Sequence, residues 1–70
     1  MSTYYREVRR KAAVGELIRV VNPIMAVGYR EGDEGTVEHT LSDGAIRVKF
    51  REVSRVVIKS EYVVLEPVEN

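Results

Sequence analysis

The sequence contains no cysteine and no tryptophan, and only one histidine and two prolines among its 70 residues. Without cysteine, disulfide bonds and thiolate metal sites are excluded, so one hydrophobic core, or association with another chain, has to stabilise the fold. The single His39 leaves too few ligands for an ordinary zinc site. A chain of this length suits one small domain and has no room for a large enclosed active site.

Long apolar runs are also missing. The run from Ile24 to Val27 falls far short of the ~20 residues that span a bilayer. The cations between Arg6 and Lys11 are not followed by the apolar stretch of a secretory signal. The absence of cysteine is compatible with a reducing compartment. We therefore expect a cytoplasmic protein that has no membrane partner.

Neither sign of charge is in excess, because 11 Lys and Arg residues balance 11 Asp and Glu residues. A balanced chain argues against unspecific coating of nucleic acid. The signs are nevertheless sorted along the chain. Residues 1–11 and 44–59 are basic, whereas residues 22–43 and the tail from residue 60 are acidic. A local basic surface is therefore possible if the strands bring these cations together.

The N-terminal segment contains the single helix candidate. Tyr4, Val8 and Ala12 repeat at helical spacing over residues 3–13. A helix this short needs a docked apolar face to be stable. The alternative is a frayed tail.

From Val14 onward, short β-like runs are separated by glycine, proline and a Ser-Asp-Gly turn signal. Strands are predicted at residues 15–21, 34–40, 45–51, 55–59 and 63–65. Closing this all-β meander into a five-stranded small barrel would bury one face of every strand. The expected core consists of Ile18, Val20, Val37, Ile46, Val48, Phe50, Val56, Ile58, Val63 and Leu65. The predicted organisation is an N-terminal extension at 1–13 (helix or tail), the barrel at 14–67 and a tail at 68–70.

Gly35 interrupts the second predicted strand, which indicates a kink or the close approach of another backbone. Alternation from Val37 points His39 inward near the end of the barrel, as an ordinary packed or rim histidine. No nucleophile or oriented triad accompanies it, so no catalytic residue is predicted. An enzyme would require an oligomer that assembles the site. Residues 31–34 lack the order of a calcium loop and no phosphate-binding Gly-Lys-Ser/Thr is present, so neither a metal nor a cofactor is expected.

Cations alternate along the third and fourth predicted strands. If these strands pair as a hairpin with Val56 and Ile58 inside, the cations stand on the outer side with Val57. This pattern predicts a charged face for phosphates or an acidic protein surface, made of Arg47, Lys49, Arg51, Arg55 and Lys59. The alternative is an ordinary solvated face. No aromatic residue lies among these cations, so backbone contacts would have to dominate any nucleic-acid interface there.

The predicted loop at residues 22–33 is apolar for a segment that should be exposed. It holds Ile24, Met25, Val27 and Tyr29. The loop either folds back over the open end of the barrel or presents a contact patch to a partner. Met25 and Tyr29 are its candidate binding residues.

The segment Gly32-Asp33-Glu34-Gly35-Thr36-Val37, followed after a hairpin by Ile46-Arg47-Val48-Lys49-Phe50, resembles the KOW-type and SH3-like small barrels. Gly15-Glu16-Leu17-Ile18-Arg19-Val20 resembles their opening strand, and Lys59-Ser60-Glu61-Tyr62-Val63 resembles the short turn before their last strand. The resemblance covers roughly Val14 to Glu66. Stand-alone proteins carried by prophages of Gram-positive bacteria look similar.

The resemblance implies an SH3-like barrel, a fold that hosts many unrelated activities. KOW-bearing proteins typically contact RNA, the ribosome or RNA polymerase. Signalling SH3 domains bind proline-rich peptides in an aromatic groove. This chain has no tryptophan, matches only Tyr62 of that groove and offers only Tyr29 in the loop, so proline-rich peptides are not the expected ligands. We therefore expect a non-catalytic binding module, monomeric or weakly homo-oligomeric, that docks onto a protein or nucleoprotein assembly. The alternative is direct RNA or DNA binding, with added charge from Arg9, Arg10 and Lys11.

Overall fold

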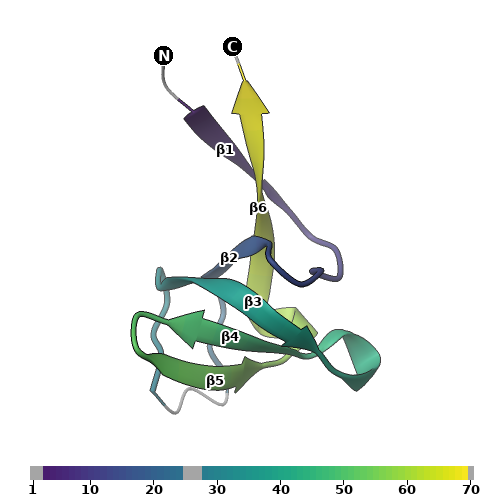
Figure 1. Cartoon of the computed structure of the whole chain (residues 1–70), viewed down its shortest axis with the longest axis vertical. Coiled ribbons are helices and arrows are strands. Elements are labelled where there is room, and N and C mark those ends of the chain that lie inside the picture. The colour runs from purple at the N-terminus through teal and green to yellow at the C-terminus, as the bar shows by residue number, and fades with distance from the viewer. Residues whose placement is uncertain (1–2, 25–27, 70) are drawn as a thin grey trace.

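The computed structural model describes residues 3–24 and 28–69, which form one antiparallel sheet of six strands (Figure 1). The strands are β1 (Thr3–Val8), β2 (Leu17–Val20), β3 (Glu34–Thr40), β4 (Ile46–Phe50), β5 (Val53–Val57) and β6 (Tyr62–Glu69). Two 3₁₀ turns, η1 (Ser42–Gly44) and η2 (Lys59–Glu61), precede β4 and β6. Neither of these described helices is long or apolar enough to cross a membrane.

The strand order is β1-β6-β2-β3-β4-β5. The all-β prediction is confirmed. The sheet has a sixth strand, and β1 and β5 remain its two edges among the described residues, so backbone pairing does not close it into a five-stranded barrel. The last strand is also longer than the predicted 63–65 segment, because β6 pairs with β2 through its first half and with β1 through its second.

The helix predicted for residues 3–13 is wrong, because the first part of this segment forms β1. β1 runs antiparallel to β6, from Thr3 opposite Glu69 to Val8 opposite Val64. Tyrosine and valine favour strands, and a short helix without a docked face is unstable in water. The alternative, a frayed tail, is also wrong for Thr3–Val8, because pairing with β6 satisfies the backbone of β1.

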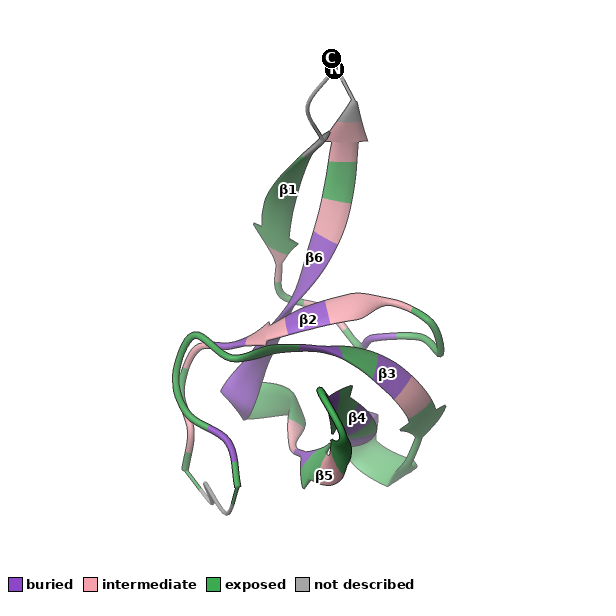
Figure 2. Cartoon of the chain, turned by 60° about the vertical axis from the view of Figure 1, so that its left-hand side comes forward, coloured by how far each residue is buried: buried purple, intermediate pink, exposed green. Residues whose placement is uncertain are grey.

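β1 and the second half of β6 form a two-stranded arm that stands away from the other strands, with both ends of the chain at its tip (Figure 1). The molecule is accordingly elongated, with extents of 36 × 21 × 20 Å. Figure 2 shows that buried residues gather in the lower part of the molecule, whereas the arm is largely exposed. Tyr4 and Tyr5 on β1 are 57% and 51% exposed.

The core lies on one face of β2, β3, β4, β5 and the first half of β6. The buried residues of this cluster are Ala12, Ile18, Val20, Tyr29, Val37, Ile46, Val48, Phe50, Val57, Tyr62 and Val64. Alternation placed the core residues of β2, β3 and β4 correctly, since burial there follows every second residue. Val63 and Leu65 are buried as predicted but lie outside this cluster.

The face predicted for β5 is inverted. Phe50 pairs with Val53, so the β4–β5 turn consists of Arg51 and Glu52 and β5 begins earlier than predicted. Because side chains alternate, this change of register moves every residue of the strand to the opposite face. Val57 is therefore fully buried, whereas Val56, predicted inside, is 44% exposed. Ile58, also predicted inside, is only half-buried.

The connection between β1 and β2 folds over the core and is tied to Tyr62. The Ala12 N–H donates to the Tyr62 hydroxyl (3.2 Å), and this hydroxyl donates to the Gly44 carbonyl (2.8 Å). Ala12 and Tyr62 are both buried. One phenol thus joins the β1–β2 connection to η1.

Two networks of ion pairs brace the arm. Arg10 contacts Glu16 (2.6 Å) and Glu66 (2.9 Å), and Arg6 contacts Glu66 (3.0 Å). The hydrogen bond from Arg10, with that from the Ala13 N–H, lowers the pKa of Glu16, and hydrogen bonds from Arg6 and Arg10 lower that of Glu66.

In the second network Arg19 of β2 pairs with Glu34 of β3 (2.9 Å) and with Glu7 of β1. Hydrogen bonds to Glu34 and Glu7 raise the pKa of Arg19. Because β6 lies between β1 and β2, the contact of Arg19 with Glu7 crosses over β6. Val63 and Leu65, the register partners of Arg19 and Glu7 on β6, are buried on this side of the sheet.

Candidate functional site

Arg47 and Lys49, here called the basic strip, lie on the outer face of β4. They alternate with the buried Ile46, Val48 and Phe50, so both cations are exposed. Neither has an ion-pair partner within the part of the chain that the structure describes. The outward direction of these two side chains is the one that the alternation along the sequence predicted.

The neighbours of the basic strip come from β3 and β5. Lys49 is opposite Thr36 and Ser54, whereas Arg47 is opposite His39 and the exposed Val56. The inward position predicted for His39 is wrong, because a bulge between Val37 and His39 shifts the register of β3. A bulge adds one residue and reverses the alternation beyond it, so His39 is exposed and opposite Arg47.

The bulge residue Glu38 accepts a hydrogen bond from the Ser54 hydroxyl (2.6 Å). Because β4 lies between β3 and β5, this hydrogen bond crosses β4. This hydrogen bond links β3 and β5, the two strands on either side of the basic strip. The basic strip therefore lies on the middle one of three strands that are held together, and not on a loop.

The other cations of the predicted face lie elsewhere. Arg51 is in the β4–β5 turn with φ 57°, a left-handed conformation. Arg55 pairs with Val48 and so belongs to the core face, where it lies against Gly28 and donates to the Ser54 carbonyl (3.1 Å). Lys59 is in η2. The prediction of a single face with five cations was thus wrong, because it assumed that Arg55 and Lys59 stand on the outer side of the fourth predicted strand.

Lys59 instead meets the β1–β2 connection. A β-carbon built on Gly44 would be 2.8 Å from Cδ of Lys59 and 3.3 Å from Cγ of Lys11, so the two alkyl chains flank this glycine. Arg9 lines a shallow pocket with Lys59 and Ser60. Arg9, Lys11 and Lys59, here called the end cluster, form a second basic area with no described ion-pair partner.

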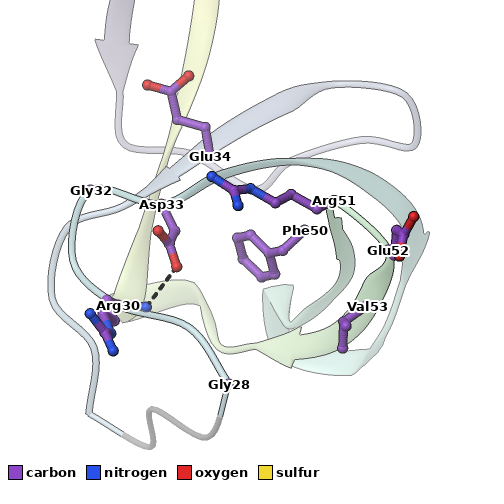
Figure 3. Close-up of a pocket in the computed structure, with 9 residues that line it drawn as sticks. All are labelled: Gly28, Arg30, Gly32, Asp33, Glu34, Phe50, Arg51, Glu52 and Val53. Carbon is purple, nitrogen blue, oxygen red and sulfur yellow. Dashed lines mark hydrogen bonds between the residues drawn. The ribbon is translucent and has the colours of Figure 1, made fainter.

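A cleft opens between the loop after β2 and the β4–β5 turn (Figure 3). Phe50 lies at its centre, and the side chain of Arg51 extends above the ring toward Asp33 and Glu34. The Arg30 N–H donates to Asp33 Oδ2 (2.9 Å) and closes the end of the loop. The lining carries both signs of charge, from Arg30, Arg51, Asp33, Glu34 and Glu52. Phe50 is 8% exposed, so the cleft offers little aromatic surface to a ligand.

Tyr29, predicted as a contact residue of the loop, is part of the core. It is 5% exposed and stacks on Phe50 with ring centroids 5.7 Å apart and 15° between the planes. The alternative weighed from the sequence, a loop that folds back over the core, is therefore the one observed at Tyr29. Met25, the other loop candidate, lies outside the described residues.

Glu61 holds this loop in place and was missed by the sequence prediction. It is fully buried, and its Oε1 accepts hydrogen bonds from the Tyr29 hydroxyl (2.7 Å) and the Ile58 N–H (3.1 Å). Its Oε2 accepts one from the Ile24 N–H (2.6 Å). One carboxylate therefore links η2 to the loop at two positions, Ile24 and Tyr29. Its sole sequence signal was its place in the Lys-Ser-Glu-Tyr turn, where it was counted with the acidic tail.

The Tyr29 hydroxyl is expected to make stability depend on alkaline pH. Burial and the hydrogen bond to Glu61 raise the pKa of Tyr29 from 10.0 to about 12. The unfolded chain therefore loses this proton first, and the free energy of unfolding should fall as the pH rises from 10 toward 12. Urea unfolding at successive pH values measures this slope.

Tyr29→Phe is the matched variant, because it keeps the ring on Phe50 and removes the titrating group. It should be less stable than the natural chain at neutral pH, where Glu61 loses a donor, and should show a shallower decline above pH 10. Equal slopes in the two proteins would contradict the assignment.

No group of three or more His, Asp or Glu side chains within residues 3–24 and 28–69 is placed to hold a metal ion. Comparisons with protein-family models, curated proteins and solved structures found no match. The basic strip and the end cluster are therefore the features of the molecule that bear on its function.

Proposed function

We propose that this chain is a non-catalytic binding module that docks onto an acidic protein surface within a protein or nucleoprotein assembly. The observation that carries the proposal is the basic strip. Arg47 and Lys49 are exposed and without a described ion-pair partner, whereas Arg6, Arg10 and Arg19 are all neutralised by carboxylates. Cations that a fold leaves unpaired on a rigid strand are available to complement an acidic partner.

The proposal includes an SH3-like barrel as the scaffold. Its strands would be β6, β2, β3, β4 and β5, which are neighbours in that order and enclose the core. The long loop after β2 and the 3₁₀ turn before β6 agree with the resemblance noted in the sequence. The arm would then be an addition to the barrel.

The strip has an apolar neighbour that a protein partner could cover. Val56 is 44% exposed and stands opposite Arg47 on the same outer face. An apolar contact beside two cations is typical of a protein interface, in which burial supplies affinity and charge supplies orientation. This neighbour favours an acidic protein surface over nucleic acid at the strip.

Binding to a labelled polyglutamate peptide, measured by fluorescence anisotropy at two salt concentrations, tests the strip directly. Arg47→Glu/Lys49→Glu should weaken binding by about tenfold or more, since reversal removes two attractions and adds two repulsions. Arg9→Glu/Lys11→Glu is the matched control, because it makes the same change of net charge in the end cluster. Equal losses in the two variants, or no loss in the first, would contradict the proposal.

Direct binding of RNA or DNA is the second candidate function, and the end cluster favours it. Lys11 and Lys59 flank Gly44, and Arg9 lines a pocket with Lys59. None of the three has a described ion pair, so all three are available to phosphate groups. If this candidate holds, affinity for single-stranded RNA should fall steeply with salt, and Arg9→Glu/Lys11→Glu should flatten the dependence. Absence of binding at low salt would remove it.

A further inference from the structure

The alternation of backbone hydrogen bonds shows which N–H and C=O groups of β1 point to the open edge of the sheet. In β2, the Val20 N–H donates to the Asp33 carbonyl, so the backbone groups of even-numbered residues point toward β3. The Val21 N–H donates to the Glu61 carbonyl, so the backbone groups of odd-numbered residues point toward β6. The backbone groups of successive residues point to opposite neighbours of a strand. In β6, the groups of odd-numbered residues therefore point toward β2, and those of even-numbered residues point toward β1.

The same alternation carries over to β1 through its register with β6. Tyr4, Arg6 and Val8 stand opposite even-numbered residues of β6 and form the hydrogen-bonded pairs. The N–H and C=O groups of Tyr5 and Glu7 therefore point to the outer edge of β1, where no described strand pairs with them. An unpaired edge of this kind can accept another strand.

The two edges of the arm differ in protection. On the β6 side, β2 reaches no further than Leu65, so Pro67 faces an open edge. Proline has no N–H, and its place in the alternation puts the missing donor on this side, which blocks an added strand. On the β1 side, neither Tyr5 nor Glu7 gives such protection. The arm can thus be extended at one edge only.

We propose that β1 pairs antiparallel with β1 of a second copy of this chain, with Tyr5 opposite Tyr5 of the second copy. The two copies would be related by a two-fold axis at Tyr5, and their two arms would form one continuous sheet of four strands. The backbone groups of residues 3, 5 and 7 from each copy would supply about six new hydrogen bonds. The arm also has a reason to associate, because a two-stranded ribbon exposed on both faces is only marginally stable, whereas four strands support one another.

Two features select this register over its two neighbours. The alternation allows two-fold pairing centred on any one residue, since residues that face each other must share the same hydrogen-bonding parity, so the neighbouring registers are centred on Tyr4 and on Arg6. Centring on Tyr4 would pair only residues 3 and 5 within the described part of β1 and would form fewer hydrogen bonds. Centring on Arg6 would put two guanidinium groups directly opposite, which is unfavourable. Centring on Tyr5 instead puts Arg6 opposite Tyr4 of the second copy, an arrangement suited to a cation–π contact. Tyr4 and Tyr5, both exposed in the single chain, would be covered.

The first test is sedimentation equilibrium of the full chain from micromolar to millimolar concentration. We expect reversible dimers that Tyr5→Pro weakens at least tenfold, because proline removes an outward N–H and leaves the donors to β6 intact. Glu31→Lys is the control, because it reverses an exposed charge in the acidic segment 31–34 and leaves β1 unchanged. It should dimerise as the natural chain does, whereas a monomeric Glu31→Lys would place the association at that segment and overturn the proposal. A chain that stays monomeric at millimolar concentration would overturn the proposal, as would equal association of Tyr5→Pro.

The second test is amide hydrogen exchange as a function of concentration, followed by NMR. The N–H groups of Tyr5 and Glu7 should exchange rapidly in dilute samples and become protected as the concentration rises, whereas those of Arg6 and Val8 are protected throughout. Concentration-independent exchange at Tyr5 and Glu7 would overturn the proposal. A synthetic chain with N-methyl-Tyr5 replaces Tyr5→Pro if that variant does not fold.

Discussion

Replacing Glu61 with alanine is expected to lower the free energy of unfolding by about 4 kcal/mol, because the buried donors that it satisfies would lose their acceptor. These donors are the Tyr29 hydroxyl and the N–H groups of Ile24 and Ile58. A 70-residue domain has little stability to spare, so much of the population should unfold or open at the loop. Urea unfolding followed by circular dichroism measures the change.

Two further variants separate the hydrogen bonds from charge alone. Glu61→Gln keeps one oxygen acceptor but turns an NH₂ group toward donors, so it should fall between the natural chain and the alanine variant. Glu31→Ala removes an exposed acid from the same loop and should leave the urea midpoint unchanged. If Glu61→Ala unfolds at the same urea concentration as Glu31→Ala, the carboxylate does not hold the loop.

Gly35→Ala should be the second most damaging change, with a loss of about 3 kcal/mol from overpacking of the core. A β-carbon at Gly35 would lie 2.5 Å from Cγ1 of Val48, 2.6 Å from the Lys49 carbonyl oxygen and 3.0 Å from Cδ1 of Phe50. The Lys49 oxygen belongs to the backbone of β4, so it cannot move aside as a side chain could. Thermal unfolding followed by circular dichroism reports the loss as a lower Tm.

Gly32→Ala is the matched control for this prediction. Gly32 has φ 93° and nothing within 4 Å of a built β-carbon, so alanine there is strained by its backbone conformation and not by contact. We expect a loss of only about 1 kcal/mol. A smaller loss at Gly35 than at Gly32 would contradict the close approach of β4, which the sequence had already indicated at Gly35.

The parts of the fold that could be predicted are the strands in which apolar and polar residues alternate without interruption, because burial there follows the same alternation. Ile46 to Phe50 alternate without interruption, so the core face of β4 and the outward direction of Arg47 and Lys49 followed directly. β1 could not be found in this way, because its pairing depends on β6 at the other end of the chain. Its tyrosines and valine fit a short helix and a strand equally well until that partner is known.

The errors in the candidate site come from two irregular positions that carry no sequence signal. Arg51 adopts a left-handed φ of 57° without being glycine, so the tight turn was placed too late and Arg55 was assigned to the wrong face. Glu38 forms a bulge that resembles an ordinary strand residue, and this turned His39 outward. Glu61 was missed for a third reason, since charged residues are almost never fully buried unless they are paired.

The way in which Glu61 holds the loop has a consequence for engineering. At Ile24 the carboxylate recognises the main-chain N–H, and the Ile24 side chain itself is 61% exposed. Every residue except proline has a main-chain N–H, so another side chain at this position would keep the hydrogen bond to Glu61. The Ile24 position should therefore accept randomised side chains, which makes this end of the loop a starting point for selecting artificial binders on the scaffold.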